Sequence, residues 1–163
     1  MRGILVSNTG PLVALALVER LDILRELFGS VLVPEAVHQE ILQGGRFGAG
    51  VAAYNDSPWI QVHVLETQLD PLLTMVLDVG EASVIQLARQ CMADAVLIDE
   101  RKARKVARTV YKLEVFGTAR LLVEAKRRGL LERVDQVLAA MRENGYWIED
   151  RIVAVALVEA GEA

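Results

Sequence analysis

The sequence predicts an α/β fold, a three-layer α/β/α sandwich with a central, mainly parallel sheet. Short apolar strands alternate with helical stretches along the chain, and this alternation is typical of parallel sheets covered by helices on both faces. The chain has 163 residues, of which 53% are hydrophobic and 25% charged. That is enough for one domain with its own core, and no linker or repeat divides residues 1–163.

The first half of the chain begins with a strand at Ile4–Val6. Pro11 is expected to open the next helix, because proline at the first helical position loses no hydrogen bond. Gly29 ends a second helix. The other elements expected in this half are a strand at Val31–Val33, a helix from Pro34 to Gly44–Gly45, a mobile loop or irregular helix at Arg46–Pro58, and a half-exposed strand at Ile60–Val64.

The second half continues the alternation of helices and strands. Strands are expected at Ala95–Ile98 and Glu114–Phe116. Helices are expected at 71–78, 79–92, 101–111, 119–128, 132–142 and 149–159. Gly129 is a natural C-terminal cap for the helix that precedes it.

Composition excludes several classes of protein. A single cysteine, Cys91, rules out an internal disulfide, and with only two histidines a closed zinc site is not expected. These features fit a reducing, cytoplasmic setting. The apolar run Leu12–Val18 is shorter than the roughly 20 residues that span a bilayer, so we expect no membrane segment. The formal net charge of −4 argues against nonspecific coating of nucleic acid.

Two predicted strands end in polar residues. The first leads into Ser7-Asn8-Thr9, and the strand Ala95–Ile98 leads into Asp99-Glu100. Ligands of open α/β sheets bind beyond the carboxyl ends of the strands, so these side chains are candidates for a site. Asp99 and Glu100 have an equally good structural explanation, because acids at a helix N-terminus cap its free N–H groups.

Glu40 and Glu81 are the other candidate acids. Glu81 follows Asp78 by three residues, which is the spacing of a capping box, yet its helix begins at the same end of the sheet as Asp99. Glu40 lies between Val37 and Ile41, which must face the sheet. It therefore borders the buried stripe, where an acid needs a partner such as a cation.

One predicted helix carries an unbroken cationic face, formed by Arg101, Lys102, Arg104, Lys105 and Arg108. A solvated helix surface would explain it. Since the face begins directly after Asp99-Glu100, it could also hold a phosphate backbone beside the carboxylates. The run Lys126–Arg128 has a simpler explanation, because cations are favourable at the C-terminal end of a helix.

Taken in order, seven short segments make the chain resemble PIN-domain proteins of the small prokaryotic type. More narrowly, it is similar to an uncharacterised PIN-like family of predicted nucleic-acid-binding proteins. The segments are Val6–Leu12, Arg20–Leu24, Val33–Val37, Gly80–Ala82, Leu97–Arg104, Phe116–Thr118 and Ala125–Leu130. PIN domains are α/β/α sandwiches. Many are Mg²⁺- or Mn²⁺-dependent ribonucleases, and several are the toxins of toxin–antitoxin pairs.

The resemblance implies an acidic site at Asn8, Glu40, Glu81 and Asp99 or Glu100. Oxygen ligands without histidine fit Mg²⁺ or Mn²⁺. Such an ion would activate water and neutralise charge on the scissile phosphate of RNA. Thr9 and Thr118 would orient water or phosphate. The implied partners are RNA and a cognate antitoxin protein, and an apolar C-terminal helix, Ile152–Val158, favours a homodimer.

Asn8 departs from the aspartate usual in active PIN nucleases. Losing one charge should weaken Mg²⁺ binding more than tenfold if it costs about 1.4 kcal/mol or more, although Asp99 and Glu100 together could compensate. The alternative is a PIN-fold module that binds RNA or protein without cleaving. A receiver domain with Asp99 as phosphoacceptor ranks last, because the early acidic pair of such domains is missing at Ser7-Asn8.

Overall fold

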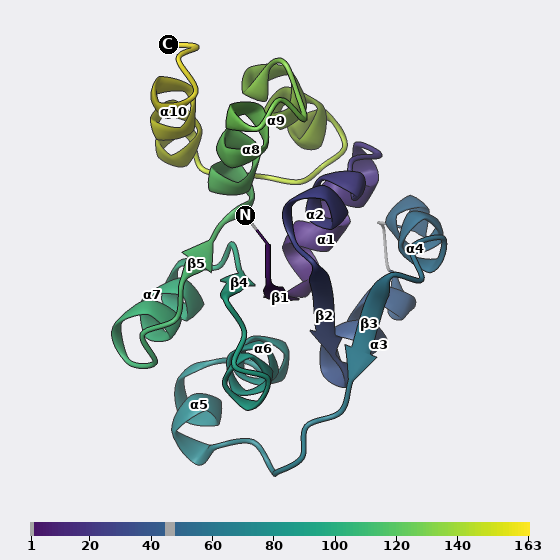
Figure 1. The fold of residues 1–163 in the computed structure, drawn as a ribbon, viewed down its shortest axis with the longest axis vertical. Coiled ribbons are helices and arrows are strands. Elements are labelled where there is room, and N and C mark those ends of the chain that lie inside the picture. The colour runs from purple at the N-terminus through teal and green to yellow at the C-terminus, as the bar shows by residue number, and fades with distance from the viewer. Residues whose placement is uncertain (1, 45–47) are drawn as a thin grey trace.

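In a computed structural model, which describes residues 2–44 and 48–163, the strands form a five-stranded, all-parallel sheet (Figure 1). Its order is β3-β2-β1-β4-β5. The strands are β1 (Ile4–Ser7), β2 (Ser30–Pro34), β3 (Ile60–His63), β4 (Ala95–Leu97) and β5 (Val115–Phe116). The predicted α/β class is confirmed, and every strand pairing is parallel.

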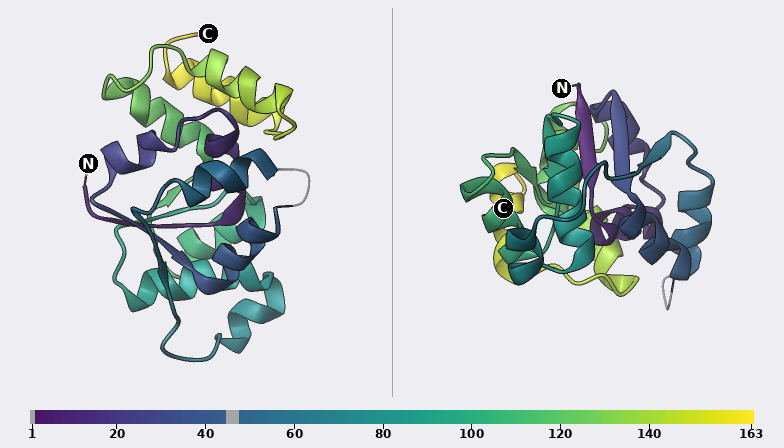
Figure 2. Two further views of the ribbon diagram at one scale, coloured as in Figure 1. Left: turned by 90° about the vertical axis from the view of Figure 1, so that its right-hand side faces the viewer. Right: turned by 90° about the horizontal axis from the view of Figure 1, so that it is seen from below.

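Helices flank both faces of this sheet. In Figure 1, α1, α2 and α8 lie above the strands, and α5 and α6 lie below them. The helices are α1 (Thr9–Leu17), α2 (Asp22–Leu27), α3 (Glu35–Gln43), α4 (Gly48–Asn55), α5 (Pro71–Val76), α6 (Val79–Gln90), α7 (Arg101–Thr109), α8 (Thr118–Arg127), α9 (Val134–Glu143) and α10 (Asp150–Glu159). The C-terminal helices α8, α9 and α10 pack together at one end of the molecule, as the left view of Figure 2 shows.

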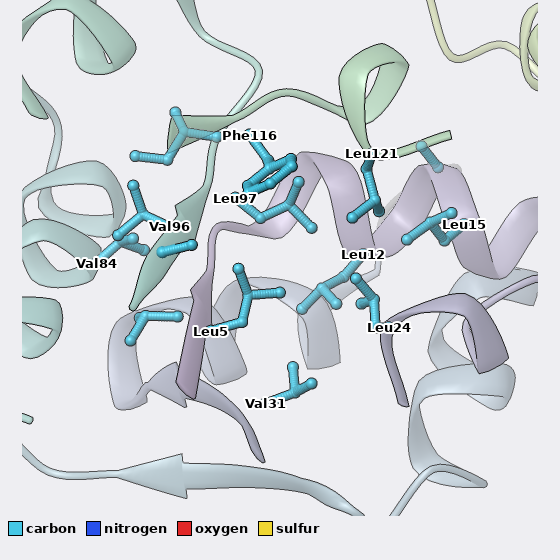
Figure 3. Close-up of a cluster of buried hydrophobic side chains, with 14 of the residues drawn as sticks. Leu5, Leu12, Leu15, Leu24, Val31, Val84, Val96, Leu97, Phe116 and Leu121 are labelled. Atoms are coloured by element: carbon cyan, nitrogen blue, oxygen red, sulfur yellow. The ribbon is translucent and has the colours of Figure 1, made fainter. Parts of the chain in front are cut away.

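The core is continuous across the central strand. Leu5 on β1 is completely buried and lies among leucines of α1, α2 and α8 (Figure 3). Val84 of α6 and Val96 of β4 lie side by side in the same cluster. Because β1 is covered on both faces, its residues read as an uninterrupted apolar run rather than an alternating one.

Several element boundaries differ from the sequence-based expectation. Helix α1 begins at Thr9, so the prediction that Pro11 opens it is wrong by two residues. Pro11 is the third helical residue, and it is still tolerated because the first four N–H groups of a helix have no internal partner. Gly44 confirms the predicted end of α3: its φ of 63° is the left-handed geometry that favours glycine.

Helix α4 and strand β3 lie between α3 and β4 in the sequence. The predicted loop or irregular helix at Arg46–Pro58 contains the regular helix α4, while Gly45, Arg46 and Phe47 lie outside the described residues. Strand β3 stands at the edge of the sheet, where Ile60 is buried but Val62 is 41% exposed. None of the helices in the described ranges is long and apolar enough to cross a membrane.

The position of β1 leads to a first prediction. Leu5→Ala should lower the free energy of unfolding by about 2–5 kcal/mol, because the buried side chain leaves a cavity between the sheet and its helices. Leu72→Ala is the matched control, since Leu72 on α5 is 68% exposed and should change stability by less than about 0.5 kcal/mol. Chemical denaturation of the two variants measures the difference, and equal values would contradict the central role of β1.

Candidate functional site

Asn8 and Asp99 follow two adjacent strands at the same edge of the sheet. Strands β1 and β4 pair in parallel up to Ser7 and Leu97, and the Asn8 N–H donates to the Leu97 carbonyl oxygen at 2.9 Å. Asn8 precedes α1 in extended conformation, yet its side chain makes no capping hydrogen bond. The amide group is therefore not used to cap its helix.

Glu40 reaches this edge from α3. One carboxylate oxygen, Oε2, accepts a 2.7 Å hydrogen bond from the Thr9 hydroxyl. The other, Oε1, lies 2.8 Å from where a Cβ would stand on Gly80, so the carboxylate lies against the first turn of α6. Val37 and Ile41 are buried as expected, but Glu40 itself is exposed. Its partner among the described residues is thus a hydroxyl, in a solvent-accessible position.

Glu81 forms the capping box that its spacing indicates. The Glu81 N–H donates to Asp78 Oδ1 at 2.8 Å, and Glu81 Oε2 accepts from the Asp78 N–H at 3.2 Å. Even so, Glu81 is only 9% exposed. Burial raises the pKa of Glu81, and the negative charges of Asp78 and Glu100 raise it further. Since Glu100 follows β4, its effect on Glu81 indicates that the start of α6 lies close to the end of that strand.

Asp99 and Glu100 have different partners. Glu100 caps α7 by accepting from the N–H groups of Lys102, at 3.0 Å, and Ala103, at 2.7 Å. The capping interpretation is thus correct for Glu100. Asp99 turns toward the start of α8, where Oδ1 accepts from the Thr118 N–H at 2.7 Å and Oδ2 accepts from the Thr118 hydroxyl.

Tyr146, which belongs to none of the predicted site residues, also contacts Asp99. Its hydroxyl donates to Asp99 Oδ2 and leaves no room for a Cβ on Gly10. Burial, followed by the charge of Asp99, raises the pKa of Tyr146 well above its ordinary value, so the phenol remains a proton donor. The only sequence signal is the aromatic pair Tyr146-Trp147 after Gly145, in a chain with few aromatic residues.

The five residues of the predicted cationic face differ in their exposure to solvent. Arg101, Lys102, Lys105 and Arg108 are exposed, as a solvated helix face would be. Arg104 is half-buried and donates to the Asp99 carbonyl oxygen at 2.9 Å, which fixes the backbone of that acid. The run Lys126–Arg128 is structural, because Lys126 pairs with Glu162 and both arginines pair with Glu124.

The donor set is chemically suited to a hard divalent cation, because Asn8, Glu40, Glu81 and Asp99 supply only oxygen atoms. Their arrangement is a poorer fit. No group of three or more acidic, histidine or cysteine side chains within residues 2–44 and 48–163 is placed to hold one ion. Both Asp99 oxygens are occupied by Thr118 and Tyr146. A cation at Asp99 Oδ2 would therefore compete with the hydrogen bonds from Thr118 and Tyr146, whereas Oδ1 accepts a single hydrogen bond.

A comparison with family models matches residues 4–162 to a family described as PIN domain. The chain therefore belongs to the PIN domain family, and the resemblance seen in the sequence is confirmed at that level. The all-parallel sheet with flanking helices is consistent with this assignment. Comparisons with curated proteins and with solved structures gave no match.

The burial of Glu81 predicts a pH-dependent cost in stability. Because folding raises its pKa, the folded state holds the proton more tightly, and stability falls as the pH rises from about 4.5 through the raised pKa. Glu81→Gln should therefore raise the melting temperature at pH 7, with no gain below pH 4. Glu35→Gln, at the exposed start of α3, is the control. A gain that is the same at both pH values would contradict this assignment.

The contact between Tyr146 and Asp99 gives a further prediction. Tyr146→Phe should lower stability by about 1.5–3 kcal/mol, the usual contribution of a hydrogen bond to a charged group. The same change should strengthen Mn²⁺ binding, since Asp99 Oδ2 then accepts only the Thr118 hydroxyl instead of two hydrogen bonds. Denaturation and titration calorimetry measure the two effects, and unchanged or weaker Mn²⁺ binding would show that Tyr146 does not compete with the ion. Tyr111→Phe is the control, since the half-buried Tyr111 ring contacts Arg89 and not Asp99.

Proposed function

We propose that this PIN-domain protein is an endoribonuclease that hydrolyses RNA phosphodiester bonds, with Glu40, Glu81 and Asp99 as catalytic residues. The observation that carries the proposal is the burial of Glu81 beside the charges of Asp78 and Glu100. Burying an acid among like charges costs stability, and such perturbed groups concentrate at functional sites. The position of the Glu40 carboxylate against Gly80, the residue before Glu81, supports it.

The proposed site would hold Mg²⁺ or Mn²⁺ through Asn8, Glu40, Glu81 and Asp99. Bound there, the ion would activate water and offset negative charge on the phosphate. The protein's own contribution is to orient the acids: Thr9 holds Glu40, Thr118 holds Asp99, and Arg104 fixes the Asp99 backbone. Glu100 is less suited as a ligand, because both of its oxygens cap α7.

A hollow beside Glu40 gives access to that acid. A cavity of about 370 Å³ is lined by Thr9, Glu40 and residues of α1, α3 and α4. The proposal extends to a toxin of a toxin–antitoxin pair that forms a homodimer and is held by a cognate antitoxin protein. Support for the dimer comes from α10, where Val155 and Val158 are exposed.

A second candidate function is an RNA- or protein-binding module that does not cleave. Asn8 supports it, because an amide brings no charge to the site. The engagement of both Asp99 oxygens by Thr118 and Tyr146 supports it as well. In this case the acids would serve the fold, with Glu81 in its capping box.

Cleavage of a labelled single-stranded RNA in the presence of Mn²⁺ tests the proposal. Glu81→Gln and Asp99→Asn should each reduce the rate at least about a hundredfold, because metal-assisted stabilisation of the transition state amounts to several kcal/mol. Glu26→Gln, which changes an exposed acid on α2, should leave the rate unchanged.

The same assay separates the two candidates. Cleavage by the native chain that both site substitutions leave unchanged would overturn the proposal. If the native chain does not cleave and Asn8→Asp does, the binding module is the correct function. Calorimetry with Mn²⁺ on the native chain and on Asn8→Asp gives an independent readout, in which the added charge should strengthen binding about tenfold or more.

A further inference from the structure

A second cavity, of about 470 Å³, has Asp99 in its lining. Helices α7, α8 and α10, strand β5 and the segment before α10 contribute to its walls. Five arginines from three helices line it, against three acidic residues. The arginines are Arg101, Arg104, Arg108, Arg120 and Arg151. A concentration of cations is thus built into a protein whose formal net charge is −4.

The arginines of this cavity are only partly neutralised. Arg120 pairs with Glu114 at 2.6 Å, and Arg104 donates to the Asp99 carbonyl oxygen. Arg101, Arg108 and Arg151 form no salt bridge with any residue that the structure describes. Like charges that outnumber their counterions repel one another, and a bound anion would relieve the repulsion.

Trp147 supplies the aromatic component of the same cavity. Its side chain is 66% exposed although it lines the cavity wall. It is held in place by Arg142, whose guanidinium lies 4.4 Å from the ring centroid. Arg142 also donates to the Ile148 carbonyl oxygen and, at 2.8 Å, to Asp150. An exposed indole fixed in this way loses little conformational freedom when a ligand stacks on it.

We propose that this cavity binds one nucleotide of single-stranded RNA, with its phosphate on Arg108 and Arg151 and its base against Trp147. Cationic grooves with exposed aromatic rings are the general means of holding single strands, and only an unpaired base is free to stack. Since Asp99 also lines the cavity, the nucleotide would lie next to the acidic site. The inference rests on the proposed function only in treating this RNA as the substrate, because binding itself requires no cleavage.

Binding is tested without metal, in EDTA, so that it is measured apart from cleavage. A fluorescent ten-nucleotide single-stranded RNA is titrated with the native chain, with Arg108→Gln/Arg151→Gln and with Trp147→Ala. The double variant should bind at least tenfold more weakly, and the slope of log K against log salt should fall by about 0.7 for each lost phosphate contact. Trp147→Ala should bind about five- to a hundredfold more weakly, with partial recovery in Trp147→Phe.

Arg25→Gln is the matched control, since Arg25 on α2 is exposed and does not line the cavity. Equal affinities for the control and the double variant would overturn the inference, as would equal binding of an RNA duplex of the same length. Polyglutamate that competes as well as RNA would assign the cavity to an acidic peptide instead.

If arginine-dependent binding is found but Mn²⁺ gives no cleavage, only the nuclease proposal fails. If cleavage is found but the arginine and tryptophan variants bind normally, only this inference fails.

Discussion

The parallel pairing of β1 with β4 is the constraint on which the rest of the structure depends. It brings the ends of two strands that are some ninety residues apart in sequence to one edge of the sheet. The hydrogen bond from the Asn8 N–H to the Leu97 carbonyl oxygen extends the pairing to the first residue beyond the strands. Because β1 lies in the middle of the sheet, its residues are also the centre of the core. Stability and the candidate site therefore depend on the same strand.

The C-terminal helices are joined to this edge by polar contacts. Tyr146, between α9 and α10, donates to Asp99, and Arg142 fixes the turn that carries Trp147. At the far end of α10, the carboxylate of Glu162 accepts from the N–H groups of Val134 and Asp135 and pairs with Lys126. Burial raises the pKa of Glu162, but hydrogen bonds from the Asp135 N–H and the Lys126 ammonium outweigh it and lower the pKa. The helices that complete the arginine-lined cavity are thus anchored at both ends.

Several residues of the site serve the fold and are candidates for function at the same time. Glu81 satisfies a capping box yet is buried among negative charges, and Asp99 satisfies the start of α8 yet stands at the ligand-binding edge of the sheet. Because one acid can both cap a helix and stand at the ligand-binding edge, the sequence alone supports a structural and a functional role for it. A helix cap uses the same carboxylate oxygens that a cation or phosphate-activating water would need.

The sequence by itself determined the α/β class, the parallel sheet and most of the elements, because apolar runs, prolines and glycines encode these locally. It also identified Asn8, Glu40, Glu81 and Asp99, whose roles as ligands stay predictions. Only the tertiary structure separated Glu100, which caps α7, from Asp99, which turns to Thr118, since neighbouring side chains point to different partners. Tyr146, Arg151 and Trp147 could not be found from local pattern either. Their contacts with the site arise from packing between segments far apart in the chain, which no periodicity records.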